Sequence, residues 1–140
     1  MRLKTNPLNS NWRWLAIAAA LLGLSAVALG AAGSHAIQLA DAVAENRWAV
    51  ALQIHFFQAA ALLALAALSA TIPAGHRLLV PCLVQLLGTL LFCGNLYLRA
   101  VAIDVLPGWT TPMGGIILLL GWVGLFLMLV TVPISDSRQP

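Results

Sequence analysis

Six polar side chains lie in or beside the long apolar stretches of this chain, and their types are the ones that could do chemistry there. They are Gln53, His55, Gln58, Asn95, Arg99 and His35. An imidazole can ligate iron, and amide or guanidinium groups can hold the oxygens of a quinone or a lipid headgroup. Because a polar group in hydrocarbon is costly unless it is satisfied, such side chains either join helices to one another or line a binding site.

The segment 78–99 sets the strongest constraint on how the chain must pack. Some of its residues stand at i, i+3, i+7, i+10 and i+14 and therefore share one face of a helix: Gln85, Gly88, Phe92, Asn95 and Arg99. A face with these polar groups cannot point at lipid. We therefore expect three further apolar segments to pack around this one.

The composition excludes a water-soluble protein. Of 140 residues, 61% are hydrophobic and only 8% are charged, with a mean hydropathy of +0.95, whereas a soluble domain has about a quarter charged residues. Four spans of roughly 20 residues with short connections use nearly the whole chain, so no separate soluble catalytic domain fits. We predict an all-α, four-span transmembrane helical bundle with short loops, forming a single integral membrane domain over residues 1–140, with spans at about 14–33, 48–72, 78–99 and 113–132.

The first predicted span carries small residues at regular helical spacing. They are Ala19, Gly23, Ala26, Gly30 and Gly33. Such a row lets another helix backbone approach closely. A cleavable secretory signal peptide is the alternative interpretation, because basic residues precede the apolar run. The run is long for a signal peptide, and we expect an uncleaved span.

The segment 34–47 between the first two spans has a two-sided pattern. Ile37, Ala40, Ala44 and Trp48 would share one face of a helix, whereas Gln38, Asp41 and Glu45 would share another. An amphipathic pattern of this kind is typical of a helix lying along the membrane surface. We therefore predict a short interfacial helix between spans 1 and 2.

Basic residues are distributed unequally between the two sides of the four predicted spans. One side holds the termini and the loop after the second span, with Arg2, Lys4, Arg13, Arg77 and Arg138, and the opposite side holds Arg47 and Arg99. Positively charged residues favour the cytoplasmic side. We expect a multi-pass protein of a bacterial inner membrane with both termini in the cytoplasm.

This topology brings the polar groups to one side of the membrane. His55 and Asn95 would both lie about 10 Å below the outer surface, and Gln53, Gln58, Arg99 and His35 are in the same half. The cluster could hold helices in place, or it could form an outer-leaflet pocket for a quinone, a lipid or another small solute. Two histidines could also ligate a haem iron, but His35 stands at a segment end and His55 lies deeper. We predict no metal or other cofactor.

Several functional classes lack the residues that they need. The seven Lys and Arg residues are scattered singly, which argues against nucleic-acid binding. The four carboxylates Asp41, Glu45, Asp104 and Asp136 fall outside the predicted spans, so no buried acid is available for ion coupling. No hydrolase, metalloprotease or phosphate-loop motif is present. Cys82 and Cys93 would lie about 16 Å apart on one helix, too far to bridge. We expect a protein that is not an enzyme.

Four short motifs carry a resemblance to a known family. They are Gly30-Ala31-Ala32-Gly33-Ser34-His35, Gly94-Asn95-Leu96-Tyr97-Leu98, Thr111-Pro112-Met113-Gly114-Gly115 and Gly121-Trp122. In these motifs, and from about residue 23 to 130, the chain resembles the YgdD-like family of small bacterial inner-membrane proteins, which has small eukaryotic membrane relatives. The resemblance implies four spans and an inner-membrane location. It implies no activity, because the family is designated as of unknown function.

One position departs from the pattern of that family. Its members typically have Tyr-Gln-x-x-His entering the second span, whereas this chain has Ile54-His55-Phe56-Phe57-Gln58, with the His and Gln types exchanged. A strict ligand role would not survive this exchange, but a hydrogen bond between helices would. The departure favours a structural role for His55.

The leading hypothesis is therefore a small accessory, assembly or stabilising subunit of a larger membrane complex, plausibly a respiratory one. Its expected partners are membrane lipids and that complex or further copies of the chain, and no nucleic acid. The alternative is a ligand-binding or transport module that uses the outer-leaflet polar cluster.

Overall fold

A computed structural model describes residues 11–71 and 75–131, and in this part of the chain the fold is all-α. Its elements are α1 (Asn11–His35), α2 (Ala42–Thr71), the short 3-10 helix η2 (Gly75–Leu78), α3 (Leu79–Ala100) and α4 (Thr110–Thr131). The four α-helices are long and apolar enough to cross a membrane. The predicted class of four apolar membrane-length helices is confirmed. Three of the basic residues used for the topology prediction, Arg2, Lys4 and Arg138, lie outside the described residues.

The helix ends follow local rules that the sequence already contained. Pro81 and Pro112 fall in the first turns of α3 and α4, where a missing backbone donor is tolerated. At the start of α2, the backbone N–H of Ala44 donates to Asp41 Oδ1 over 2.8 Å, so Asp41 is the N-cap of this helix.

The prediction of a separate interfacial helix was wrong. Residues 36–41 form a connection without helix, and residues 42–47 are the first turns of α2. The physical reason is the cap at Asp41, which starts a helix that continues straight into the span. Two residues of the apolar face that predicted an interfacial helix, Ala44 and Trp48, belong to α2 and are buried.

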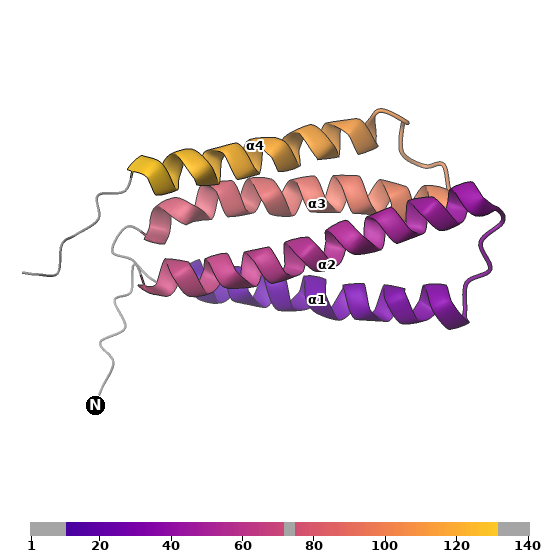
Figure 1. Cartoon of the computed structure of the whole chain (residues 1–140), viewed down its shortest axis with the longest axis horizontal. Helices are drawn as coiled ribbons and strands as arrows, with labels where there is room; N and C mark the ends of the chain where they lie inside the picture. Colours follow the sequence, from indigo (N-terminus) through magenta and orange to yellow (C-terminus); the bar gives the residue numbers. More distant parts are fainter. Residues whose placement is uncertain (1–10, 72–74, 132–140) are drawn as a thin grey trace, which may run out of the picture.

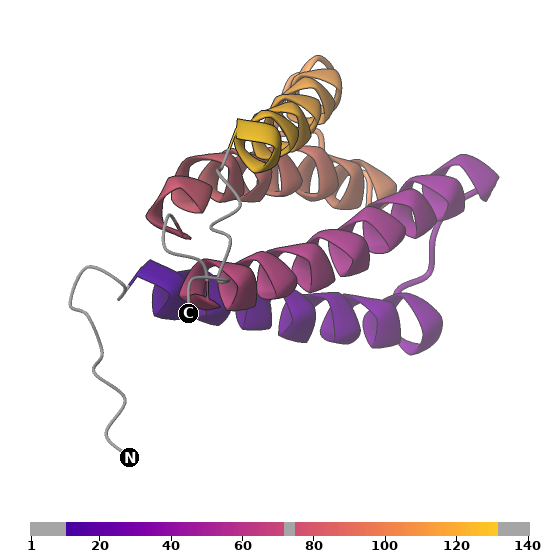
Figure 2. The same cartoon turned by 60° about the vertical axis from the view of Figure 1, so that its left-hand side comes forward.

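The helices stand side by side in chain order, each antiparallel to the next (Figure 1). Among the described residues, α2 packs on α1 and α3, α4 packs mainly on α3, and α1 meets α3 only slightly. Figure 2 shows α1 and α4 at opposite edges of this row. The prediction that three segments pack around the helix at 78–99 is wrong for α1, which packs mainly against α2. The edge helices α1 and α4 therefore each have a wide outer face.

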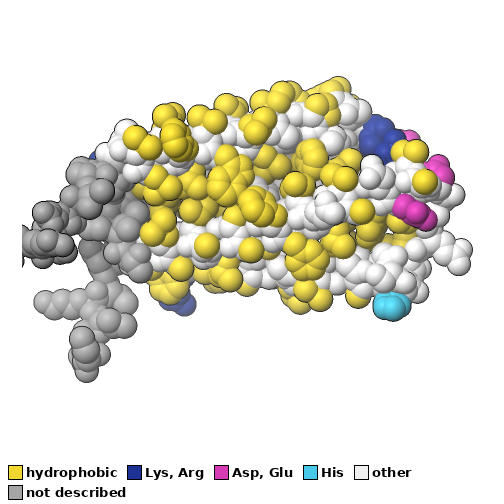
Figure 3. Space-filling view, viewed as in Figure 1, with side chains coloured by type: hydrophobic (Ala, Val, Ile, Leu, Met, Phe, Trp, Pro, Cys, Tyr) yellow, Lys and Arg dark blue, Asp and Glu magenta, His cyan; other side chains and the backbone are white. Residues whose placement is uncertain are grey.

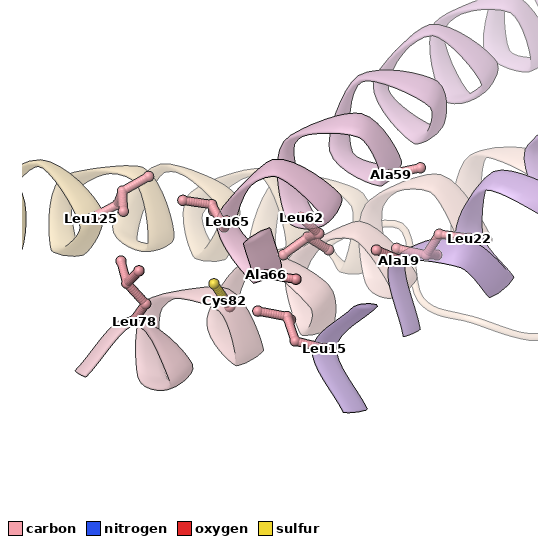
Figure 4. Close-up of a cluster of buried hydrophobic side chains, with 10 residues drawn as sticks. All are labelled: Leu15, Ala19, Leu22, Ala59, Leu62, Leu65, Ala66, Leu78, Cys82 and Leu125. Carbon is pink, nitrogen blue, oxygen red and sulfur yellow. The ribbon is translucent and has the colours of Figure 1, made fainter. Parts of the chain in front are cut away.

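A hydrophobic core joins all four helices near the end of the molecule where α2 leads into α3 (Figure 4). Its buried members are Leu15, Ala19, Leu22, Ala59, Leu62, Leu65, Ala66, Leu78, Cys82 and Leu125. The outer surface is also apolar: Figure 3 shows hydrophobic side chains along the middle of the molecule and charged ones towards its ends. This distribution suits helices that face acyl chains and end in the headgroup region.

Candidate functional site

The face of α3 predicted to avoid lipid is packed against α4. Gln85 and Asn95 are both 0% exposed. A Cβ placed on Gly121 would lie 2.6 Å from Gln85 Cγ, and one on Gly88 would lie 2.8 Å from the backbone nitrogen of Leu118. The two backbones are therefore in direct contact, as expected for helices that meet through small residues. The expectation that this face points inward is confirmed.

His55 joins three helices through its two ring nitrogens. Its Nε2 lies 3.2 Å from Ser25 Oγ on α1, and its Nδ1 lies 3.3 Å from the Tyr97 hydroxyl on α3. Ser25 Oγ itself donates to the backbone oxygen of Leu22 over 2.9 Å, so it accepts from Nε2–H. We therefore assign the Nε2-protonated tautomer, with the Tyr97 hydroxyl donating to Nδ1. Both nitrogens are used, so no lone pair of His55 is free for iron.

Trp48 completes this part of the structure, about two turns before His55 on the same face of α2. Its ring meets Tyr97 edge-on, with 4.8 Å between ring centroids and 68° between planes. A Cβ on Gly33 would overlap the indole nitrogen of Trp48. The glycine in the motif Gly30–His35 thus leaves room for the indole at the α1–α2 interface.

A second polar cluster joins α3, the following loop and the start of α4. Asn95 Nδ2 donates to Thr111 Oγ1 over 2.9 Å, and an Arg99 Nη2–H donates to the backbone oxygen of Leu106 over 3.3 Å. Arg99 also forms an ion pair with Asp104 at 3.6 Å. An ion pair this exposed contributes little stability. The cluster holds the 101–109 loop against the end of α3.

The same loop begins with an unusual helix ending. Ala102 has a φ of 59°, a conformation that glycine normally supplies. Its N–H donates to the backbone oxygen of Arg99, and the N–H of Ile103 donates to that of Leu98. These are the two bonds of a Schellman ending, which compensate the strain at Ala102.

The remaining predicted site residues do not join either cluster. Gln53 and His35 are exposed, because Gln53 lies about 200° around the helix from His55 and His35 ends α1. Gln58 is 1% exposed, and neither polar atom of its side chain has a hydrogen-bond partner among the described residues. The structure therefore shows two hydrogen-bonded clusters and a separate buried amide in place of one outer cluster.

The sequence reasoning missed four participating residues: Ser25, Trp48, Tyr97 and Thr111. Tyr97 and Thr111 stand in two of the quoted motifs, which was an available signal. Within the described ranges, no group of three or more His, Cys, Asp or Glu side chains could hold a metal ion.

These observations define a class: a small membrane protein of four antiparallel helices joined by buried hydrogen bonds and a glycine-containing α3–α4 contact. The family described as "Protein of unknown function (DUF423)" matches residues 29–115, which include every residue of both clusters except Ser25. The chain belongs to this family, also designated UPF0382. The resemblance seen in the sequence is thereby confirmed.

Relatives in three bacteria support the assignment. The UPF0382 inner membrane protein YgdD of Escherichia coli K12 is 34% identical over 123 residues, covering 84% of this chain and 88% of its own. A UPF0382 membrane protein of Haemophilus influenzae is 35% identical over 107 residues (76% and 85%), and YwdK of Bacillus subtilis is 28% identical over 109 residues (76% and 88%). No solved structure matches. The chain is thus a multi-pass protein of the bacterial inner membrane from a family of unknown function.

Proposed function

We propose that this protein is a non-catalytic subunit that helps to assemble or stabilise a larger membrane-protein complex. The observation that carries the proposal is the use of its intramembrane polar groups. His55 joins α1, α2 and α3, and Asn95 joins α3 to α4. Side chains that form hydrogen bonds between helices are not available to bind and convert a substrate.

The partner would contact the outer faces of the edge helices. Two glycines of the edge helices are used within the chain: Gly33 of α1 packs on Trp48, and Gly114 of α4 packs on Phe92. The outward side chains of α4 remain apolar and exposed, among them Leu119, Val123 and Phe126. A larger membrane protein offers such a face the same apolar environment as lipid, with closer packing.

Purification from native membranes tests this proposal. A tagged chain at natural abundance, extracted in a mild detergent, should elute with a larger membrane protein at a constant ratio. Native mass measurement of the intact particle then gives the partner's mass and separates a complex from a homo-oligomer. A particle with the mass of this chain alone, or of a few copies of it, would refute the subunit proposal.

We further propose that both termini lie in the cytoplasm. Arg13 and Arg77 stand at the end of the molecule where α1 begins and α2 leads into α3, and both are exposed. The opposite end holds Arg47 and Arg99, and Arg99 forms an ion pair with Asp104. Counted along the sequence, five basic residues belong to the side of the termini and two to the opposite side, and such an excess of Lys and Arg favours a cytoplasmic face.

Reporter fusions at the C-terminus test this orientation. A fused green fluorescent protein should fluoresce, and a fused alkaline phosphatase should be inactive, because the first folds in the cytoplasm and the second needs the oxidising periplasm. A fusion placed in the 101–109 loop should give the reverse pattern. An active C-terminal phosphatase fusion would reverse the proposed orientation.

A second candidate function is a ligand-binding or transport module for a quinone, a lipid or a small solute. One observation favours it: among the residues described, the side-chain amides of Gln58 and Gln85 are both buried without a hydrogen-bond partner.

A further inference from the structure

The loop between α3 and α4 presents an apolar surface at one end of the molecule. Val105 is 70% exposed and Trp109 is 64% exposed, and the exposed apolar side chains of the loop are Val101, Ile103, Val105 and Trp109. Exposing large apolar side chains to water is unfavourable, and a group of them marks a surface that something other than water covers. The loop therefore needs an apolar environment on at least one side.

The charge of the loop is compensated within the chain. Asp104 is the only Asp, Glu, Lys or Arg in the sequence from position 101 to 109, and it forms an ion pair with Arg99 at 3.6 Å. The loop together with Arg99 thus has no net formal charge. A neutral apolar segment suits the boundary between headgroups and acyl chains, where polar ends stay at the headgroup level.

Bonds within the chain satisfy backbone groups at both ends of the loop. Ala102 and Ile103 donate their N–H groups to carbonyl oxygens in the last turns of α3. The carbonyl oxygen of Leu106 accepts from Arg99 Nη2 over 3.3 Å, and that of Pro107 accepts from the first backbone N–H of α4 over 3.0 Å. Backbone groups near hydrocarbon are costly unless protein partners satisfy them. The loop meets this requirement at the two points where it leaves α3 and enters α4.

The lengths of the helices place the loop at the edge of the hydrocarbon layer. With 22 residues, α4 is about 33 Å long, close to the ~30 Å thickness of that layer, whereas α2 has 30 residues and is about 45 Å long. Figure 1 shows α2 continuing past the start of α4 at this end. The first turns of α2 contain the polar residues Glu45, Asn46 and Arg47, in contrast to the apolar loop that enters α4.

We propose that the 101–109 loop binds the phospholipid leaflet at this end of the molecule, with Ile103, Val105 and Trp109 in contact with acyl chains. Under the proposed orientation this is the outer leaflet. Arg99 is a positioning residue, because its guanidinium satisfies a loop carbonyl and the one loop carboxylate.

Lipid is the occupant because the loop continues a surface that acyl chains already reach. Met113 and Ile116, in the first turns of α4, are exposed apolar side chains directly after the loop, and α4 spans the bilayer. The proposal is separate from the subunit proposal, which needs the outer face of α4 and not the loop. Co-purification of a partner can therefore fail while the loop is shown to lie in lipid.

Spin labels report what surrounds the loop. In a Cys82→Ala, Cys93→Ala background, in vesicles of phosphatidylethanolamine and phosphatidylglycerol, a nitroxide is attached to Val105→Cys or to the control Asn46→Cys, which is exposed on α2 at the same end. Oxygen concentrates in acyl chains, and a water-soluble nickel chelate is excluded from them. We expect the ratio of oxygen to nickel collisions to be about fivefold higher at position 105 than at position 46. Equal ratios would place the loop in water, and few collisions with either reagent would place it against protein; both results overturn the proposal.

Removing the Arg99 guanidinium tests why the loop lies there. Arg99→Ala takes away the bond to the Leu106 oxygen and the ion pair with Asp104, so both groups then need water. We expect the collision ratio at position 105 to fall about twofold. Arg47→Ala, which removes a basic residue at the same end, should leave the ratio unchanged. Equal ratios in the two variants would show that Arg99 does not position the loop.

Tryptophan fluorescence repeats the measurement with both cysteines in place. The signal of Trp109 is the difference between the unsubstituted protein and Trp109→Phe, a mild change at an exposed position. In vesicles of lipid brominated in the upper part of the acyl chains, we expect this difference signal to fall about twofold. A Trp109 signal that bromine leaves unchanged, and that acrylamide in the water quenches instead, would overturn the proposal.

Discussion

Replacing Gly114 with alanine should destabilise the protein more than any other single methyl addition in α4. The new Cβ would lie 2.5 Å from the backbone nitrogen and 2.9 Å from the Cα of Phe92. Backbone atoms in a helix cannot rotate away as a side chain can, so α4 must separate from α3. We expect a loss of about 2–3 kcal/mol, in the range for overpacked interiors. Reversible unfolding in mixed detergent and SDS, followed by tryptophan fluorescence, measures this loss.

The adjacent glycine is a matched control. A Cβ on Gly115 would lie 3.7 Å from the nearest ring carbons of Phe92, which is ordinary contact. Gly115→Ala should therefore leave the unfolding free energy within about 0.5 kcal/mol or raise it slightly, because alanine favours helix. Similar losses in both variants would mean that α3 and α4 do not meet through Gly114.

The second large effect is expected at His55. Leucine at this position removes the bonds to Ser25 and Tyr97 and leaves the part-buried Tyr97 hydroxyl without its acceptor. Measured hydrogen bonds between membrane helices average about 0.6 kcal/mol each, and an orphaned group adds to the loss. We expect His55→Leu to lower the unfolding free energy by about 1–3 kcal/mol in the same assay.

Gln53→Leu is the corresponding control on the same helix. Gln53 is exposed on the outer face of α2, so leucine there should leave stability unchanged or increase it. A double-mutant cycle of His55→Leu with Tyr97→Phe should show coupling, because the two residues share one hydrogen bond. Strictly additive effects would show that the His55–Tyr97 contact contributes nothing.

Much of the fold could be predicted because membrane helices satisfy their backbone within each segment. The four apolar stretches, the proline positions near helix starts and the inward face of 78–99 all follow from local composition and spacing. The prediction of an interfacial helix was wrong for a local reason too. The capping aspartate at position 41 outweighed the amphipathic pattern that surrounds it.

The site could be predicted only in part. Asn95 and Arg99 were identified, but their partners are Thr111 and the backbone of the 101–109 loop. The sequence analysis grouped Gln53 with His55 because both lie at a similar depth in the membrane. A similar depth does not determine to which side of the helix a side chain points. Two residues of separation turn a side chain to the opposite side.

The sequence by itself determined that this chain forms four membrane helices and which face of the helix at 78–99 turns away from lipid. Only the tertiary structure decided that Ser25, His55 and Tyr97 meet, and that Gln58 beside them is left without a partner. The physical reason is that helix formation depends on neighbours along the chain. The register between helices depends on how the small residues of one, such as Gly33, receive the large side chains of the next, such as Trp48.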